Sequence, residues 1–244
     1  TRIVGGYHAS YFPEEALTHA HFVVRSEGLS QLRKILRREE VTPGILNIQK
    51  FSVAEMQKEN IRNPWDHPLR KIPLPDREGF YNAYPNYAKS PIKSLITMTG
   101  CPYTCSYCYN ASFEQGVGVG MGNRVFPKNI RDVSDVISEA KEILRLCPDT
   151  KMIYCQDDIH GPNLLWLEEF AARWSREIGL PYHAQMRFEM LKGVEGTRRL
   201  EMVKKAGCTG LTLAIESADS QIRREVLNRD MPQDLIFEGM KKLA

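Results

Sequence analysis

Two patterns of hydrophobic residues alternate along most of the chain, one typical of buried strands and one typical of amphipathic helices. Apolar and β-branched runs with the composition of buried strands lie at 94–100, 152–155, 182–188 and 209–215. Apolar residues at helical spacing fill the intervals and continue to the end of the chain, at 131–146, 164–174, 197–206 and 234–244. This alternation predicts an α/β domain over 91–244, with about four βα units around a parallel sheet.

The first ninety residues show a shorter version of the same alternation. Strand-like segments at 2–6 and 21–24 are followed by helical patterns near 14–20 and 29–38. A stretch rich in proline then precedes the main domain. We therefore predict the C-terminal part of an α/β domain over 1–40, a proline-rich linker over 41–90 and the main domain over 91–244.

Both ends of the sequence look cut. The chain begins without Met on a strand-like segment, and it stops inside a helical pattern with no capping residue or Gly after it. We expect a fragment of a longer protein, with the main domain truncated at its carboxyl end.

Charge excludes little and hydropathy excludes a membrane span. The 33 Lys and Arg residues nearly balance the 30 Asp and Glu residues, and a net charge of +3 does not favour nucleic acid as a partner. No run approaches the roughly 20 apolar residues that a membrane span needs, and the first residues do not have a signal-peptide layout. We expect a cytoplasmic protein without a membrane partner.

Three of the six cysteines lie close together in the segment GCPYTCSYCYN, as Cys101, Cys105 and Cys108. In a reducing compartment, clustered cysteines bind metal or perform chemistry more often than they form disulfides. Three thiolates on one loop suit an iron–sulfur cluster, and without a fourth cysteine in the loop a four-iron cluster would keep one iron open to an exogenous ligand. The alternatives are a structural zinc site and chance spacing.

This spacing, with an aromatic residue before the last cysteine, resembles the radical S-adenosylmethionine (SAM) superfamily over about 90–244. The resemblance implies a partial (β/α)6 barrel and a [4Fe–4S] cluster whose open iron binds the amino and carboxylate groups of SAM. It implies reductive cleavage of SAM to a 5′-deoxyadenosyl radical that abstracts hydrogen from an unreactive carbon. It also implies that Tyr107 contacts the adenine and that flavodoxin or ferredoxin supplies the electron, while the small-molecule or peptide substrate and any catalytic residue stay unidentified.

Two aspartates follow the predicted strand 152–155, where members of this family carry a short polar motif. By similarity, Asp157 or Asp158 binds the ammonium group of SAM, for which a charge-assisted hydrogen bond is well suited. The glycine-glycine-glutamate form of that motif is absent, so either aspartate is a candidate. A solvated acidic turn or a helix cap is the alternative.

Polar residues also mark the ends of the next two predicted strands. Gln185 and Arg187 share the inward parity of their strand, and by similarity Arg187 binds the cofactor carboxylate or a substrate anion. A buried structural salt bridge is the alternative for Arg187. Glu216 and Ser217 resemble the family's glutamate-serine motif, which contacts the ribose of SAM, although Ala214 replaces a frequent Gly. Helix capping is the alternative there.

The order of motifs near the amino terminus resembles one branch of the superfamily. The pair Gly5 and Gly6 is followed by an EG motif, a proline-rich segment with LPDR and then the cysteine motif. This order resembles the branch with an N-terminal, Rossmann-like cobalamin-binding domain, in which paired glycines let the backbone approach the cobalamin nucleotide.

That branch implies a cobalamin-dependent transferase that moves a methyl group to an unactivated carbon. The alternatives are a cobalamin-independent enzyme that modifies peptide or RNA or forms rings, and a non-catalytic zinc-binding module. Residues 1–40 would hold only the remnant of the cobalamin-binding domain.

Overall fold

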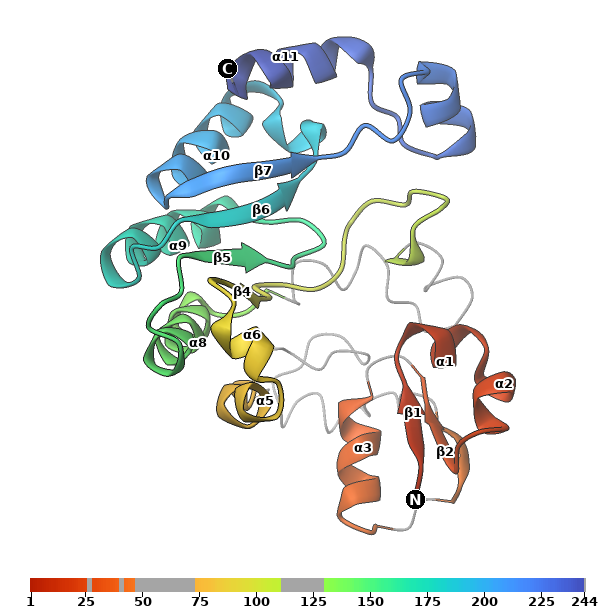
Figure 1. The fold of residues 1–244 in the computed structure, drawn as a ribbon. Coiled ribbons are helices and arrows are strands. Elements are labelled where there is room, and N and C mark those ends of the chain that lie inside the picture. Colours follow the sequence, from red (N-terminus) through yellow and green to blue (C-terminus); the bar gives the residue numbers. More distant parts are fainter. Residues whose placement is uncertain (26–27, 40–41, 47–72, 111–129, 244) are drawn as a thin grey trace, which may run out of the picture. The chain divides into compact units, whose positions relative to one another are not determined.

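The computed structural model describes residues 1–25, 28–39, 42–46, 73–110 and 130–243 (Figure 1). The chain divides into two compact units, each with its own parallel sheet. Unit 1 comprises Thr1–Pro68 and Pro102–Val125, and unit 2 comprises Leu69–Cys101 and Phe126–Ala244. An α/β fold with parallel sheets is what the sequence predicted.

Unit 1 contains a three-stranded parallel sheet in the order β1-β2-β3. Its strands are β1 (Ile3–Gly5), β2 (Phe22–Val24) and β3 (Gly44–Leu46). The helices in its described part are α1 (Tyr7–Tyr11), α2 (Pro13–Leu17) and α3 (Leu29–Leu36). Ala9 of α1, Ala16 of α2 and Val23 of β2 form its small buried core, and every residue of β2 is buried.

Unit 2 contains a four-stranded parallel sheet in the order β4-β5-β6-β7, consistent with part of the predicted barrel. Its strands are β4 (Ile92–Leu95), β5 (Met152–Cys155), β6 (Tyr182–Met186) and β7 (Cys208–Leu213). Its longer helices are α8 (Val133–Leu146), α9 (Leu164–Glu177), α10 (Gly193–Lys205) and α11 (Gln233–Leu243). It also contains a 3₁₀ turn (Phe188–Leu191) and a π turn (Ile222–Val226).

The core of unit 2 lies between the sheet and helices α8, α9 and α10, which pack side by side (Figure 1). Alternate strand residues such as Ile153, Tyr182 and Ala184 are fully buried against these helices. Phe170 and Trp174 of α9 place their rings 5.6 and 5.8 Å from the Tyr182 ring. The opposite face of the sheet is more polar and carries His183, Gln185 and Thr212.

Two short helices lie in the interval 41–90, which the sequence indicated to be a linker. They are α5 (Arg77–Ala83) and α6 (Pro85–Lys89), and β3 falls in the same interval. The Asp76 carboxylate caps α5 by accepting a hydrogen bond of 2.8 Å from Gly79 N. Pro85 begins α6, where a missing N–H has no consequence. Proline in this region therefore marks a helix start as well as an irregular segment.

Strand β4 ends at Leu95, whereas the run 94–100 predicted a strand that continues to residue 100. The sequence pattern is apolar through Met98, but the amides of Thr97 and Met98 donate to a carboxylate instead of to a neighbouring strand. Strand β6 similarly stops at Met186, and α10 begins at Gly193, four residues before the expected start. At the end of β4 the difference arises because a side chain replaces the neighbouring strand as the partner of the backbone amides.

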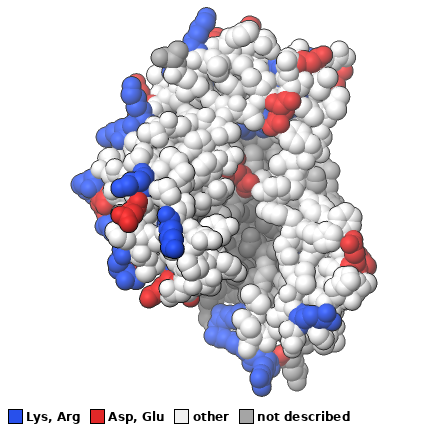
Figure 2. All heavy atoms as spheres, viewed as in Figure 1, with Lys and Arg blue, Asp and Glu red and all other residues white. Residues whose placement is uncertain are grey.

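Two further features of the molecule are the distribution of charge on its surface and the length of its helices. Basic and acidic side chains are interspersed on the face shown in Figure 2. Within the described part of the chain, none of the helices has both the length and the apolar character required to span a bilayer.

A buried acidic residue of α8 supports the end of β4. Glu139, 1% exposed, forms ion pairs with both Arg77 and Arg131. These arginines also donate to the backbone, Arg77 to Ser94 O and Arg131 to Ile96 O, each at 2.8 Å. One carboxylate therefore orients two cations that bind the carbonyls at the carboxyl end of β4.

We predict that Glu139→Gln lowers the free energy of unfolding by about 3 kcal/mol or more, because it leaves two poorly solvated cations without their counter-ion. Glu142→Gln is the matched control on the same helix, since Glu142 pairs with Arg145 at the surface and should matter little. Urea denaturation followed by circular dichroism measures both. Equal effects of the two substitutions would contradict this account.

Candidate functional site

The three clustered cysteines lie in a loop that follows β4. Cys105 is 4% exposed, whereas Cys101 and Cys108 are half-buried. A turn brings Cys108 N within 3.0 Å of Cys105 O. No disulfide joins any of the six cysteines, all of which lie in the described part of the chain. The donor set is therefore three thiols within eight consecutive residues, which is the soft ligand chemistry that an iron–sulfur cluster requires.

Two tyrosines flank the last cysteine of the loop. The Tyr107 side chain, the predicted adenine contact, is about half exposed. Tyr109 is held within unit 1, where its carbonyl accepts a hydrogen bond of 2.9 Å from Tyr11 Oη and its ring lies 4.2 Å from that of Tyr7. The end of the cysteine loop is thus fixed to α1.

Asp157 is completely buried after β5 and accepts four hydrogen bonds. Its Oδ1 accepts from Thr97 N at 2.6 Å and Met98 N at 3.2 Å. Its Oδ2 accepts from Thr97 Oγ1 at 2.6 Å and lies 2.8 Å from His160 Nδ1. The carboxylate therefore joins the exit of β4 to the loop after β5.

Asp158 points to the same segment but is only half-buried. Its Oδ2 accepts a hydrogen bond of 2.7 Å from Gly100 N. Gly100 has a φ of 87°, a conformation that a residue with a Cβ rarely adopts, so the turn before Cys101 requires glycine.

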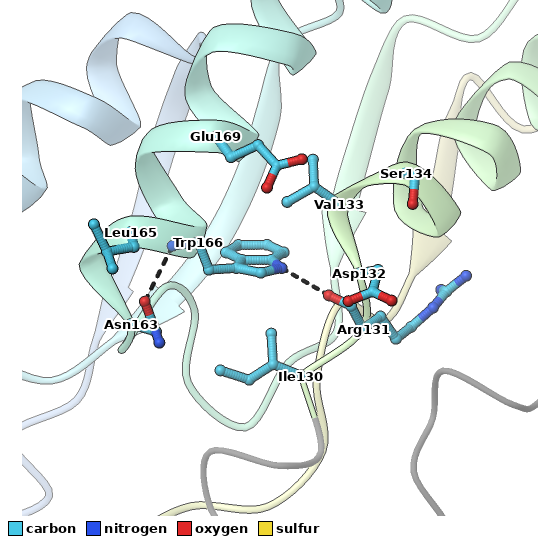
Figure 3. A pocket seen from close by; sticks show the side chains of 9 residues that line it. All are labelled: Ile130, Arg131, Asp132, Val133, Ser134, Asn163, Leu165, Trp166 and Glu169. Atoms are coloured by element: carbon cyan, nitrogen blue, oxygen red, sulfur yellow. Dashed lines mark hydrogen bonds between the residues drawn. The ribbon is translucent and has the colours of Figure 1, made fainter. Parts of the chain in front are cut away.

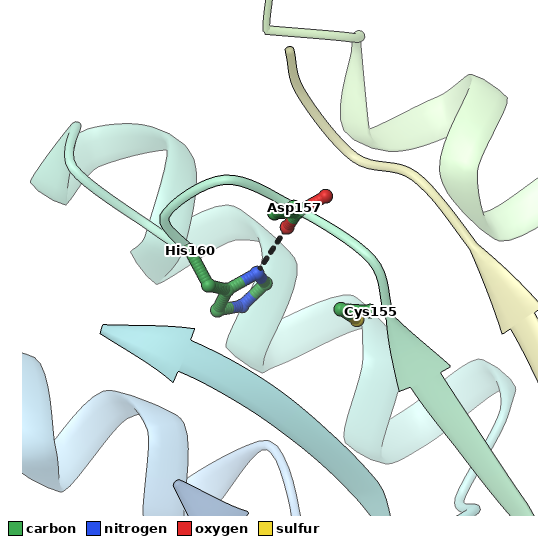
Figure 4. A group of neighbouring side chains, drawn as sticks. All are labelled: Cys155, Asp157 and His160. Atoms are coloured by element: carbon green, nitrogen blue, oxygen red, sulfur yellow. Dashed lines mark hydrogen bonds and ion pairs between the residues drawn. The ribbon is translucent and has the colours of Figure 1, made fainter. Parts of the chain in front are cut away.

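Cys155, Asp157 and His160 form a compact group of side chains in the described part of unit 2 (Figure 4). Their ligand-type atoms lie within 4.8 Å of one another, and all three residues are fully buried. Burial, with a smaller contribution from the Asp157 charge, raises the pKa of the Cys155 thiol well above its usual range. Because the carboxylate is already occupied by four donors, we interpret this group as a hydrogen-bonded core element and not as a metal centre.

Gln185 and Arg187 lie at the carboxyl end of β6. Gln185 is half-buried, and its backbone carbonyl accepts a hydrogen bond of 2.7 Å from His160 N. Arg187 is 6% exposed and forms an ion pair with Glu189, which is the structural alternative that the sequence left open.

Glu216 and Ser217 follow β7 in a strained and well-anchored loop. Glu216 has a φ of 68°, a left-handed conformation that is uncommon for residues other than glycine and that is concentrated at functional sites. The fully buried Arg223 donates to Ser217 O at 2.7 Å and to Ala218 O at 2.9 Å. A buried cation therefore holds the loop that displays the Glu216 carboxylate.

The structure thus brings six predicted residues to one edge of the unit 2 sheet, at the carboxyl ends of β5, β6 and β7. They are Asp157, Asp158, Gln185, Arg187, Glu216 and Ser217. Sequence reasoning missed three buried residues that hold this edge, Thr97, His160 and Arg223. The one available signal was the spacing of His160, three residues after Asp157.

The predicted glycine pair lies at the carboxyl end of β1 in unit 1. Gly6 has a φ of 90° and precedes α1, so it makes a tight turn from strand to helix. A Cβ on Gly5 would lie 3.3 Å from Val24 O, so the backbone of β1 approaches β2 closely there.

A separate cavity of about 400 Å³ lies between the amino-terminal ends of α8 and α9 (Figure 3). Trp166 forms one wall, and its Nε1 donates to Arg131 O at 2.7 Å. Asn163 caps α9 by accepting a hydrogen bond of 3.0 Å from Trp166 N. The described residues that line this cavity include none of the predicted site residues.

Comparison with protein families identifies the segment that carries the cysteine loop. The family model described as Radical SAM superfamily matches residues 95–244, which is more than half of the chain and includes all three clustered cysteines. The chain belongs to the radical SAM superfamily. Comparison with curated protein sequences gave no match. Members of this superfamily are enzymes that use a [4Fe–4S] cluster and SAM, so the chain is a radical SAM enzyme with an iron–sulfur, metal-binding site.

We predict that the radical SAM loop cysteines and Cys155 differ in reactivity. In protein without a cluster at about pH 8, Cys101 and Cys108 should be alkylated by iodoacetamide roughly tenfold or more faster than Cys155, because burial disfavours the reactive thiolate of Cys155. Peptide mass spectrometry measures the rates, and denatured protein is the control in which the difference should vanish. Rapid labelling of Cys155 in the folded protein would contradict its burial.

Proposed function

We propose that Cys101, Cys105 and Cys108 hold a [4Fe–4S] cluster that binds SAM and cleaves it reductively. The observation that carries this proposal is the presence of three thiols within eight residues, inside the segment that matches the radical SAM superfamily. When bound and reduced, the cluster would supply the electron that converts SAM into methionine and a 5′-deoxyadenosyl radical. A flavodoxin or ferredoxin is the proposed source of that electron.

Several residues are proposed to bind SAM around this cluster. Tyr107 would contact the adenine, for which its half-exposed ring is suited. Asp158 would accept from the ammonium group, and Gln185 would contribute a polar contact from β6. Arg187 would face the cofactor carboxylate or a substrate anion, with Glu189 fixing the orientation of its guanidinium.

Glu216 and Ser217 are proposed to bind the ribose. The left-handed backbone at Glu216 supports this role, because such strain clusters at ligand-binding sites. It costs about 1–3 kcal/mol and persists only where the surrounding structure enforces it. The buried Arg223 provides that enforcement by binding the carbonyls of the same loop.

We further propose that the protein uses cobalamin and transfers a methyl group to an unactivated carbon of a small molecule or peptide. The support is the parallel sheet of unit 1 with Gly5 and Gly6 at the carboxyl end of β1, followed along the chain by the radical SAM segment. Glycine at such a strand end lets a bulky cofactor approach the backbone. Retention of added methylcobalamin by the longest available protein, measured by its visible absorption, tests this part.

We predict that Cys105→Ala abolishes the cluster. Anaerobic reconstitution with iron and sulfide should give unchanged protein about four irons per chain, and its reduced electron paramagnetic resonance signal should shift when SAM is added. The variant should bind little iron and give no such signal, because two thiolates do not complete the site. Cys208→Ala, outside the loop, is the matched control and should retain the cluster. A colourless protein loaded with one zinc would overturn the proposal.

We predict that two substitutions at Glu216 separate its backbone strain from its carboxylate. Both Glu216→Gly and Glu216→Ala should weaken SAM binding about tenfold, because both remove the polar contact. The glycine variant should be more stable than the alanine variant by about 1 kcal/mol, because only glycine adopts this φ without strain. Equilibrium dialysis and thermal melting measure the two effects. Unchanged SAM affinity in both variants would remove Glu216 from the site.

A further inference from the structure

We propose that Asp157 is a positioning residue and not a ligand of SAM. With Thr97 and His160, it fixes the backbone that leads into Cys101. This inference rests on the proposed function, because the segment that Asp157 holds carries the first cysteine of the cluster loop.

The hydrogen bonds of Asp157 leave no acceptor for a cofactor. An ionised carboxylate has about four lone-pair sites, two on each oxygen. Two backbone amides occupy Oδ1, and the Thr97 hydroxyl and the His160 ring occupy Oδ2. An incoming ammonium group would displace one of these donors and leave it buried without a partner, which is unfavourable. The residue is also fully buried, so the carboxylate presents no surface to a ligand.

The two aspartates after β5 take most of the amides that lead to Cys101. Within the segment 97–100, the first two amides donate to Asp157 and the last donates to Asp158. A strand would have used these amides for pairing, so the aspartates decide where β4 stops.

The same segment is held on its other side by residues that precede α8. Arg131 N donates to Thr97 O at 2.9 Å, and Ile130 pairs with Met98 in an antiparallel bridge. The backbone just before Cys101 is therefore fixed on both sides by protein groups. A cluster ligand needs this kind of support, since partners behind metal ligands set the orientation of those ligands.

His160 completes the arrangement from inside the core. Its ring lies 5.3 to 5.8 Å from the rings of Trp166, Phe170 and Tyr182, so its immediate neighbours in the core are aromatic. Its Nε2 is buried and makes no hydrogen bond, so the polar contact of the ring is the one that Nδ1 makes with Asp157. A histidine at this position is explained by the need to fill the fourth acceptor site of that carboxylate.

The test compares Asp157→Asn, Thr97→Val and their combination. Asp157→Asn keeps the side-chain shape but turns one acceptor oxygen into a donor, while Thr97→Val removes one donor at a position that is itself fully buried. Because Thr97 is fully buried, we expect any effect of its substitution to reach the cluster through the backbone or through Asp157. Asp149→Asn makes the same chemical change as Asp157→Asn at an exposed residue and is the control. Thermal melting confirms that each variant folds.

We expect both single substitutions to lower the rate of reductive SAM cleavage roughly 10- to 100-fold and to alter the cluster signal before SAM is added. The Kd for SAM should stay within about threefold of that of the unchanged protein, and the double variant should show less than the sum of the two effects. An increase of tenfold or more in the Kd for Asp157→Asn, with Thr97→Val unchanged, would show that Asp157 is a direct ligand. Unchanged cleavage and spectra in both variants would also overturn the inference.

A second readout separates this inference from the proposed function. If the unchanged protein builds no cluster, the proposed function fails, and amide hydrogen exchange of residues 97–100 in the cluster-free protein still tests the positioning role. Asp157→Asn and Thr97→Val should speed exchange in this segment relative to Asp149→Asn. Exchange equal to that of the control would overturn the role of Asp157 in either case.

Discussion

The completely buried carboxylate of Asp157 joins the exit of β4 to the loop after β5, at the candidate functional edge of unit 2. A charge without solvent is tolerated only when its hydrogen-bonding sites are filled, and here donors from the exit of β4 and from His160 fill them. Two of those donors are the successive backbone amides of Thr97 and Met98. The hydrogen bonds that stabilise the buried carboxylate therefore also end the strand, because these amides no longer pair with a neighbouring strand. The chain can then turn at Gly100 into the loop that carries the cysteines.

The backbone carbonyls near the same end of β4 are bound by positively charged side chains. Glu139 orients Arg77 and Arg131, and these cations bind the carbonyls of Ser94 and Ile96. Carboxylates therefore take the amides that leave β4, and guanidinium groups take carbonyls near its end. An irregular segment is kept ordered because its backbone groups have side-chain partners in place of a neighbouring strand. Order at this point bears on the proposed function, since Cys101, the first of the three proposed cluster ligands, follows directly.

The sequence predicted well what depends on local pattern and spacing. Strand β5 and helix α9 follow from apolar periodicity, and the radical SAM superfamily follows from the spacing of three cysteines and is confirmed by the family match. The end of β4 could not be predicted, because it depends on Asp157, sixty residues away along the chain. Helices α5 and α6 were not predicted, because the many prolines in the interval 41–90 led us to interpret it as a linker.

Burial divides the polar residues at this edge into two groups that a motif comparison cannot separate. Thr97, Asp157 and Arg223 are fully buried and bind other parts of the protein, whereas Asp158 and Ser217 are only half-buried. Two adjacent aspartates that look equivalent in sequence thus have different surroundings, one saturated by the protein and one at the surface of the edge. A functional role transferred by sequence position alone has no means of choosing between them. Burial and the four donors around the Asp157 carboxylate do distinguish them, and they support the proposal that Asp157 holds the frame while the more accessible Asp158 contacts a ligand.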